Sequence, residues 1–277
     1  MRIDAHHHLW DLDTLDQPWT RDIPVLRRSF TMDDLRPELD RSDVDATVVV
    51  QTVPVPRETP ELLALAGRDP RVAAVVGWAD LTDPALPDRL AELRALPGGA
   101  ALVGIRHGVQ DEPDPDWTAR PDVRAGLAAV GATGLVYDLL VRPDQLAGAV
   151  RTVRELPGVR FVLDHGGNPV VGPDGFTPWA KLMAELAACP NVAVKLSGLV
   201  TRTDPPFARA LRPYARLLLD RFGPERVMFG SDWPVCLLAA DYGTVVSATE
   251  ELTDGLDEDE SALVFGGTAA RWYGVPA

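Results

Sequence analysis

The sequence predicts an α/β fold in a single domain, a (β/α)8 TIM barrel that takes up residues 1–277. Three observations support this fold. Eight short apolar runs alternate with helix-like segments, no low-complexity linker divides the chain, and polar residues follow several of the runs. Such barrels commonly need about 250 residues, which the chain supplies. A doubly wound open sheet is the alternative, but no Gly-x-Gly-x-x-Gly turn follows the first run.

The first apolar run leads into three consecutive histidines. Side chains two apart on a strand share a face, so His6 and His8 should point to one side, while His7 packs behind the strand. The later runs are rich in Val, Ile and Leu, which is typical of strands buried on both faces. The predicted strands cover residues 3–10, 46–53, 72–79, 102–107, 135–140, 159–165, 192–197 and 227–232.

Helices are predicted between these strands. Thr31 and Asp34 form a capping pattern at the start of the first helix, and proline lies at or near the start of several others. Residues 11–30 are rich in Asp, Pro and Trp without a clean period, so they predict a long loop of the kind that is often functional. The predicted helices cover residues 32–43, 58–67, 84–96, 121–130, 143–156, 178–188 and 207–222.

Composition narrows the class of protein. A hydrophobic content of 46% and a charged content of 25% are those of a soluble globular chain. The formal charge of −14 argues against nucleic acid or an anionic membrane as a partner. No apolar run reaches the roughly 20 residues of a membrane span, and the start lacks a signal peptide pattern. We therefore expect a cytoplasmic protein in which Cys189 and Cys236 are reduced thiols.

The polar residues at strand ends should meet in one place. In a (β/α)8 barrel the carboxyl ends of the strands open on one face, where active sites lie. This arrangement would bring together four histidines and one acid from four different strands. They are His6, His8, His107, His165 and Asp232.

Five segments carry a resemblance to a known family. They read IDAHHHLW at residues 3–10, GIRH at 104–107, FVLDH at 161–165, VKLSGL at 194–199 and FGSDWP at 229–234. Together they resemble the amidohydrolase superfamily, in its metal-dependent-hydrolase-like branch of sugar lactonases, over the whole chain. The resemblance implies a reaction centre made of the first-strand His-x-His, the sixth-strand His and the eighth-strand Asp. It also implies a hydrolase of carbohydrate metabolism that opens sugar-acid lactones, similar to L-fuconolactonases and L-rhamnonolactonases.

The chain departs from the sequence pattern of this family in two places. Binuclear members carry a bridging Lys or Glu on strand four and a further His on strand five, where this chain has Arg106-His107 and Tyr137-Asp138. We therefore expect at most one metal. The sixth-strand loop reads GGNP at residues 166–169 instead of Leu-Gly-Lys-Pro, so the substrate contacts of that loop are left open.

Three imidazoles and one carboxylate suit a single divalent metal, Zn2+, with an open position for water. The predicted ligands are His6, His8, His165 and Asp232. Asp232 is also the predicted general base, although Ser-Asp before Trp-Pro would serve equally as a turn cap. Metal-independent chemistry is the alternative, with the histidines acting directly on the lactone carbonyl and Asp232 as base.

Other residues complete the predicted site. Besides Asp232 and His165, catalytic roles are expected for Arg106, as a donor fork for an oxyanion or substrate, and for Lys195, placed in the barrel mouth. A structural ion pair is the alternative for Arg106. Lys195 draws attention because only it and Lys181 are lysines among 27 basic residues. The substrate-binding candidates are His107, Tyr137, Trp10, Gln51 and Trp233, each of which alone would more often serve packing.

The leading prediction is thus a carboxylic ester hydrolase in which water attacks the carbonyl of a small-molecule lactone. A zinc-dependent decarboxylase of the same superfamily is the enzymatic alternative. A binding protein without catalysis on a barrel scaffold is the alternative from another class, since fold alone does not fix function. The sequence does not indicate an oligomeric state.

Overall fold

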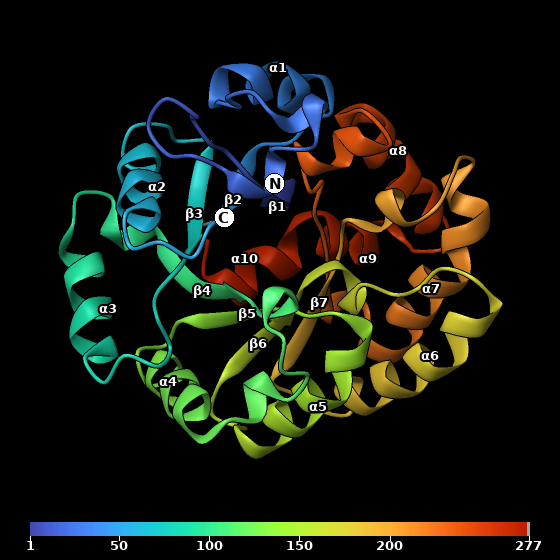
Figure 1. The fold of residues 1–277 in the computed structure, drawn as a ribbon. Coiled ribbons are helices and arrows are strands. Elements are labelled where there is room, and N and C mark those ends of the chain that lie inside the picture. The colour runs from blue at the N-terminus through green and yellow to red at the C-terminus, as the bar shows by residue number, and fades with distance from the viewer. Residues whose placement is uncertain (276–277) are drawn as a thin grey trace.

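The computed structural model describes residues 1–275, which form a barrel of eight parallel strands surrounded by helices (Figure 1). Each strand pairs with the next along the chain, so the strand order never reverses. This order confirms the (β/α)8 barrel and excludes a doubly wound sheet. The strands are β1 Ile3–His7, β2 Ala46–Val50, β3 Val72–Gly77, β4 Leu102–Gly108, β5 Val136–Leu140, β6 Arg160–Leu163, β7 Val192–Leu196 and β8 Val227–Phe229.

The barrel closes where its first and last strands meet. His7 forms a parallel bridge with Trp233, just beyond β8. Two backbone hydrogen bonds flank this bridge, from Asp232 N to His6 O at 2.8 Å and from His8 N to Trp233 O at 2.6 Å. The seam of the barrel therefore runs through the segments that carry the predicted reaction centre.

An outer ring of helices covers the strands (Figure 1). The first begins with the predicted capping box, in which Thr31 N donates to Asp34 Oδ2 at 2.9 Å. The sixth begins earlier than predicted, because Pro173 rather than Pro178 occupies its first turn. The ring consists of α1 Met32–Arg41, α2 Glu58–Ala66, α3 Leu86–Ala95, α4 Pro121–Ala132, α5 Leu146–Glu155, α6 Pro173–Ala187, α7 Phe207–Phe222 and α8 Tyr242–Leu252.

Apolar residues fill both sides of the sheet. One cluster lies inside the barrel and includes Val48, Val76 and Val162, whereas a larger one lies between strands and helices. The predicted elements end at residue 232, but α8, α9 Glu258–Ala262 and α10 Thr268–Tyr273 follow in the structure. Trp272 and Tyr273 of α10 join the interior cluster, so this helix closes the amino-terminal end of the barrel (Figure 1). The opposite end stays open.

The helices and the two cysteines were also subjects of prediction. Within residues 1–275, every helix is too short or too polar to cross a lipid bilayer. Cys189 and Cys236 are both buried, and neither forms a disulfide.

Candidate active site

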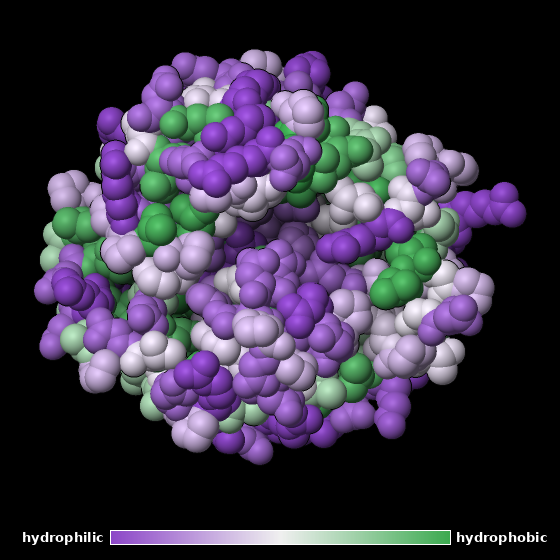
Figure 2. All heavy atoms as spheres, viewed as in Figure 1, coloured by the Kyte–Doolittle hydropathy of each residue, from purple (hydrophilic) through white to green (hydrophobic). Residues whose placement is uncertain are grey.

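A cavity of about 440 Å³ lies at the carboxyl ends of the strands. Figure 2 shows this end of the molecule hollowed at its centre, with mostly hydrophilic side chains around the opening. Six of the predicted site residues line the cavity. They are His8, Gln51, Arg106, His107, His165 and Asp232.

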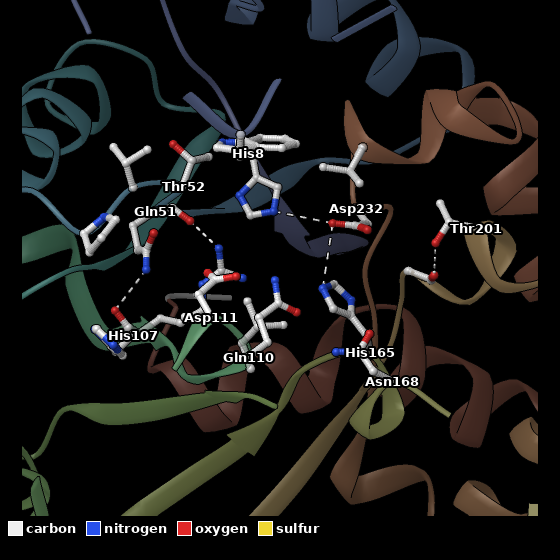
Figure 3. Close-up of a pocket in the computed structure, with 18 of the residues that line it drawn as sticks. His8, Gln51, Thr52, His107, Gln110, Asp111, His165, Asn168, Thr201 and Asp232 are labelled. Carbon is white, nitrogen blue, oxygen red and sulfur yellow. Dashed lines mark hydrogen bonds and ion pairs between the residues drawn. The ribbon is translucent and has the colours of Figure 1, made fainter. Parts of the chain in front are cut away.

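The predicted reaction centre comes together around one carboxylate oxygen. Asp232 Oδ1 lies 3.4 Å from His8 Nε2 and 3.7 Å from His6 Nε2. It lies 3.9 Å from His165 Nε2. The two imidazoles of the first strand approach each other, with their Nε2 atoms 3.2 Å apart. Figure 3 shows His8, His165 and Asp232 converging on one side of the pocket.

A β-bulge aims the first-strand histidines. The pairing of β1 with β2 changes register between Asp4 and His7. Ile3 and Ala5 can therefore pack inside the barrel while His6 also turns inward, into the site. Bulges often lie beside active sites for this reason. His7 faces away from the cavity, fully buried, as predicted for the alternating strand.

His165 and Asp232 both sit on strained backbone. Their φ angles are 54° and 58°, in the left-handed region that residues other than glycine rarely adopt. Hydrogen bonds hold both residues, because Asp232 N donates to His6 O and Ser197 Oγ lies 2.9 Å from His165 Nδ1. Strain of this kind is concentrated at functional sites, where the surrounding structure must maintain it.

Asp4 fixes the turn that carries Asp232. Its fully buried carboxylate accepts hydrogen bonds from Ser231 N at 2.9 Å, Ser231 Oγ at 2.6 Å and Tyr242 Oη at 3.1 Å. Burial raises the pKa of Asp4 to about 6, although these hydrogen bonds oppose that shift. No role was predicted for Asp4, whose only signal in the sequence was an acidic residue two positions before His6.

Lys195 lies beneath the site and not in the mouth, which corrects the position expected from the sequence. Its Nζ is 3.1 Å from His6 Nδ1, 2.6 Å from Asp138 Oδ2 and 3.0 Å from Asp164 Oδ1. The side chain is fully buried and does not line the cavity. Alternation predicted the inward direction of Lys195. Its depth in the barrel, however, leaves its ammonium against His6, two carboxylates and the Tyr273 ring, whose centroid is 5.4 Å away.

Arg106 joins the same buried ionic cluster from the cavity side. Its Nη1 donates to Asp164 Oδ2 at 3.1 Å and lies 3.4 Å from His6 Nε2. Burial opposes ionisation of Asp164, but Lys195, His6 and Arg106 hold the pKa of Asp164 well below its usual range. Arg106 therefore forms the ion pair expected as its structural alternative and also lines the cavity. Asp164 was missed because its only signal was its place before His165.

The buried environment sets the charge states of the site. Burial lowers the pKa of His8 to about 3 and lowers those of His6 and His165, so the three imidazoles are neutral at pH 7. Burial raises the pKa of Asp232 above its usual value, against the attraction of His165 and Arg106. His8 Nδ1 donates to Val50 O at 2.8 Å, because a carbonyl oxygen can only accept. Its Nε2 lone pair consequently faces Asp232.

These atoms could hold one metal ion. Ligands of a tetrahedral Zn2+ lie roughly 2.0–2.2 Å from the metal and hence roughly 3.3 Å from one another. The nitrogen and oxygen atoms of His6, His8 and Asp232 match this spacing, and the free lone pair of His8 suits a ligand. A second possible group contains His6, Asp164 and His165. It fits less well, because Asp164 already contacts Arg106 and Lys195.

Three of the predicted substrate-binding residues do not line the cavity. Tyr137 is fully buried on the outer side of β5, where its ring packs against Phe161 with centroids 6.2 Å apart. Trp10 donates its indole N–H to Arg28 O at 2.7 Å. Trp233 packs against Phe30 at 5.3 Å. All three stabilise the surroundings, and alternation along β5 is why Tyr137 points outward.

His107 does line the cavity, in a fixed arrangement with three neighbours. Trp78 Nε1 donates to His107 Nδ1 at 3.1 Å. An indole N–H can only donate, so the imidazole carries its hydrogen on Nε2 and donates it to Glu112 Oε1 at 2.8 Å. The ring also stacks on Trp117 with centroids 4.5 Å apart. His107 thereby holds Glu112 at the cavity wall.

Most of the remaining lining residues lie on loops that follow the strands, and none of them was named as a site residue from the sequence. Trp19 lies on the predicted loop of residues 11–30, which therefore reaches the cavity. Arg202 donates to Asn168 Oδ1 at 2.6 Å, and both residues line the cavity. Asn168 belongs to the loop whose sequence departs from the sugar-lactonase pattern.

Comparison with known proteins agrees with this geometry. A family model described as Amidohydrolase matches residues 3–275. The chain is 40% identical to an L-fucono-1,5-lactonase from Burkholderia ambifaria over 280 residues, which are 99% of this chain and 96% of that protein. It is 26% identical to an L-rhamnono-gamma-lactonase from Scheffersomyces stipitis, over 62% of this chain and 59% of that protein.

Solved structures show the same architecture. An amidohydrolase from Burkholderia multivorans, crystallised with bound zinc, is 39% identical and superposes with a TM-score of 0.94 over all of both chains. A 5-carboxyvanillate decarboxylase from Sphingomonas paucimobilis shares the fold at 16% identity, with a TM-score of 0.72 over 99% of each chain. With its sequence, its barrel and its histidine–aspartate site in agreement, the chain belongs to the amidohydrolase family.

Proposed function

We propose that this protein hydrolyses a sugar-acid lactone, with L-fucono-1,5-lactone as the first substrate to test. The observation that carries the proposal is the single carboxylate oxygen of Asp232, which faces three neutral imidazoles in a cavity of small-molecule size. The 40% identity with L-fucono-1,5-lactonases over nearly the whole chain supports this choice of substrate.

In the proposed reaction, Asp232 accepts a proton from a water molecule whose oxygen attacks the lactone carbonyl carbon. The bond between this carbon and the ring oxygen then breaks, and the proton passes to the departing oxygen, which gives the open hydroxy acid. His8 and His165 would orient the water and the carbonyl, since their Nε2 atoms lie beside Asp232. Arg106 would stabilise negative charge on the carbonyl oxygen.

We also propose that the site takes one divalent metal, and Zn2+ in particular. His6, His8, His165 and Asp232 would hold it, and it would lower the pKa of the water and polarise the carbonyl. The zinc-bound structure of the Burkholderia multivorans relative supports this proposal. Elemental analysis of the purified protein, followed by chelation and a second assay, separates a metal-dependent reaction from a metal-independent one. A cytoplasmic role in carbohydrate metabolism stays a prediction.

The decisive experiment compares wild type with Asp232→Asn on L-fucono-1,5-lactone, using acid release as the readout. General-base catalysis typically contributes about 10²- to 10⁴-fold, so kcat/KM should fall by at least about 10²-fold while the circular dichroism spectrum is unchanged. Asp220→Asn is the matched control, because Asp220 is exposed on α7. Retention of most activity in Asp232→Asn would reject the proposed base. Release of carbon dioxide from a carboxylated substrate, without lactone opening, would favour the decarboxylase alternative.

A further inference from the structure

The cavity wall formed by the ends of β2 and β4 contains two polar atoms without a partner within residues 1–275. They are Gln51 Oε1 and Arg106 Nε. Both side chains line the cavity, yet Gln51 is only 2% exposed and Arg106 only 4%. Burying a polar group without a hydrogen bond costs roughly 1–3 kcal/mol, so natural proteins seldom keep such groups without a reason.

Reciprocal hydrogen bonds hold these two side chains in place. Gln51 Nε2 donates to Arg106 O at 3.1 Å, and Arg106 Nη2 donates to Gln51 O. The orientation of the Gln51 amide is determined, because a carbonyl oxygen can bond only to the NH2 group. The amide oxygen is therefore the free atom of Gln51. Arg106 Nη1 donates to Asp164 and Nη2 to Gln51 O, which leaves Nε as the one guanidinium nitrogen without a partner within residues 1–275.

Gln51 lies across the cavity from Asp232, and Arg106 connects it with the reaction centre, because Arg106 Nη2 donates to Gln51 O while Arg106 Nη1 lies 3.4 Å from His6 Nε2. Figure 3 shows Gln51 on one side of the pocket, with Asp232 and His165 on the other. A lactone whose carbonyl lies beside Asp232 would therefore turn its ring substituents toward Gln51. A ring substituent at this wall would meet one hydrogen-bond acceptor, Gln51 Oε1, and one donor, Arg106 Nε, both on side chains that are held in place.

We propose that Gln51 Oε1 and Arg106 Nε form a subsite that binds one ring hydroxyl of the substrate. The hydroxyl donates its hydrogen to Gln51 Oε1 and accepts a hydrogen bond from Arg106 Nε. A hydroxyl oxygen is suited to both contacts, whereas a carboxylate cannot donate and a methylene group satisfies neither atom. The inference rests on the proposed lactonase function and deepens it, since it makes Gln51 a determinant of specificity for hydroxylated lactones.

The experiment measures kcat/KM for wild type and Gln51→Leu on two six-membered lactones, L-fucono-1,5-lactone and the unsubstituted δ-valerolactone. Loss of a hydrogen bond to a substrate hydroxyl should lower the value for the hydroxylated lactone by roughly tenfold to hundredfold. The value for δ-valerolactone should fall by at least about tenfold less, because that substrate has no hydroxyl to lose, whereas any shift of Arg106 would affect both lactones alike. An equal loss on both lactones would overturn the proposal and assign Gln51 a packing role.

A panel of lactones that each lack one hydroxyl gives a second test, whose first part uses the wild type alone. Wild type should discriminate at least roughly tenfold against one member of the panel, and Gln51→Leu should lose discrimination at that position alone. Equal kcat/KM values of the wild type for every member would refute the subsite. This result differs from failure of the proposed function, in which wild type would open none of the lactones.

Discussion

Glu58 offers a test of how burial governs stability beside the site. This residue of α2 accepts hydrogen bonds from Thr52 N at 2.8 Å and Val53 N at 3.2 Å, and also from Thr52 Oγ1. It therefore anchors the backbone directly after Gln51. Burial raises the pKa of Glu58 from 4.5 to about 7, although the hydrogen bonds from Thr52 and Val53 oppose the shift.

The sign and size of the effect follow from these two pKa values. The folded protein keeps the Glu58 proton up to about pH 7, whereas the unfolded chain releases it near pH 4.5. The contribution of this group to the free energy of unfolding is therefore greatest below pH 4.5 and falls as the pH rises through 7. At 1.36 kcal/mol per pH unit, the interval from 4.5 to about 7 corresponds to about 3 kcal/mol.

Urea unfolding of wild type and Glu58→Gln between pH 4 and pH 8 measures this contribution. The glutamine variant loses an acceptor at every pH, which adds a constant offset. Relative to that variant, wild type should become less stable by about 3 kcal/mol from pH 4 to pH 8. Glu61→Gln on the same helix is the control, because the Glu61 side chain is 39% exposed and pairs with Arg57. A difference between wild type and Glu58→Gln that does not vary with pH would refute the reasoning.

Two further predictions concern the site itself. Gly198 has a φ of 65°, and a Cβ atom there would lie 2.5 Å from His165 Nδ1 and 3.1 Å from Asp232 Oδ2. Gly198→Ala should lower kcat/KM on L-fucono-1,5-lactone by about 10²-fold, because the added methyl group displaces these side chains. Gly255→Ala is the control and should leave kcat/KM unchanged, since nothing lies within 4 Å of a Cβ atom there. An unchanged kcat/KM for Gly198→Ala would contradict the assigned geometry. The raised pKa of Asp232 means that kcat/KM should fall tenfold per pH unit below a pKa that lies above 3.8. A pH–rate profile whose acid limb begins at or below 3.8 would contradict Asp232 as the buried base.

Sequence periodicity predicted which way side chains point but not how deep they lie. His6 and His8 were expected on one face, and they do converge. Lys195 was likewise expected to point inward and does, yet it lies below His6, out of reach of the cavity. Inward residues of a barrel stack in layers, and only the uppermost layer contacts substrate. The layer depends on strand tilt and register, which a single sequence does not display.

Contacts between distant segments were also beyond prediction. Tyr273 of α10 donates to Asp138 on β5, which itself pairs with Lys195. No pattern linked Tyr273 to the barrel interior, because the pairing depends on how the last helix closes the fold. The loop residues Trp19 and Arg202 reach the cavity for a similar reason. Turn and loop sequences indicate where strands end, but their paths are set by the packing beneath them.

The seam between β1 and β8 links catalysis to completion of the chain. The Ser231 side chain lies 3.5 Å from the His6 carbonyl, although the two residues are 225 positions apart in the chain. The site therefore exists only after the last strand has docked on the first. A nascent chain released before β8 would lack both the base and the bond from Asp232 N to His6 O. Lactone opening would therefore report directly on how many molecules in a refolding mixture have closed their barrel. Partly folded forms would show no activity in such an assay, even if they contained much helix.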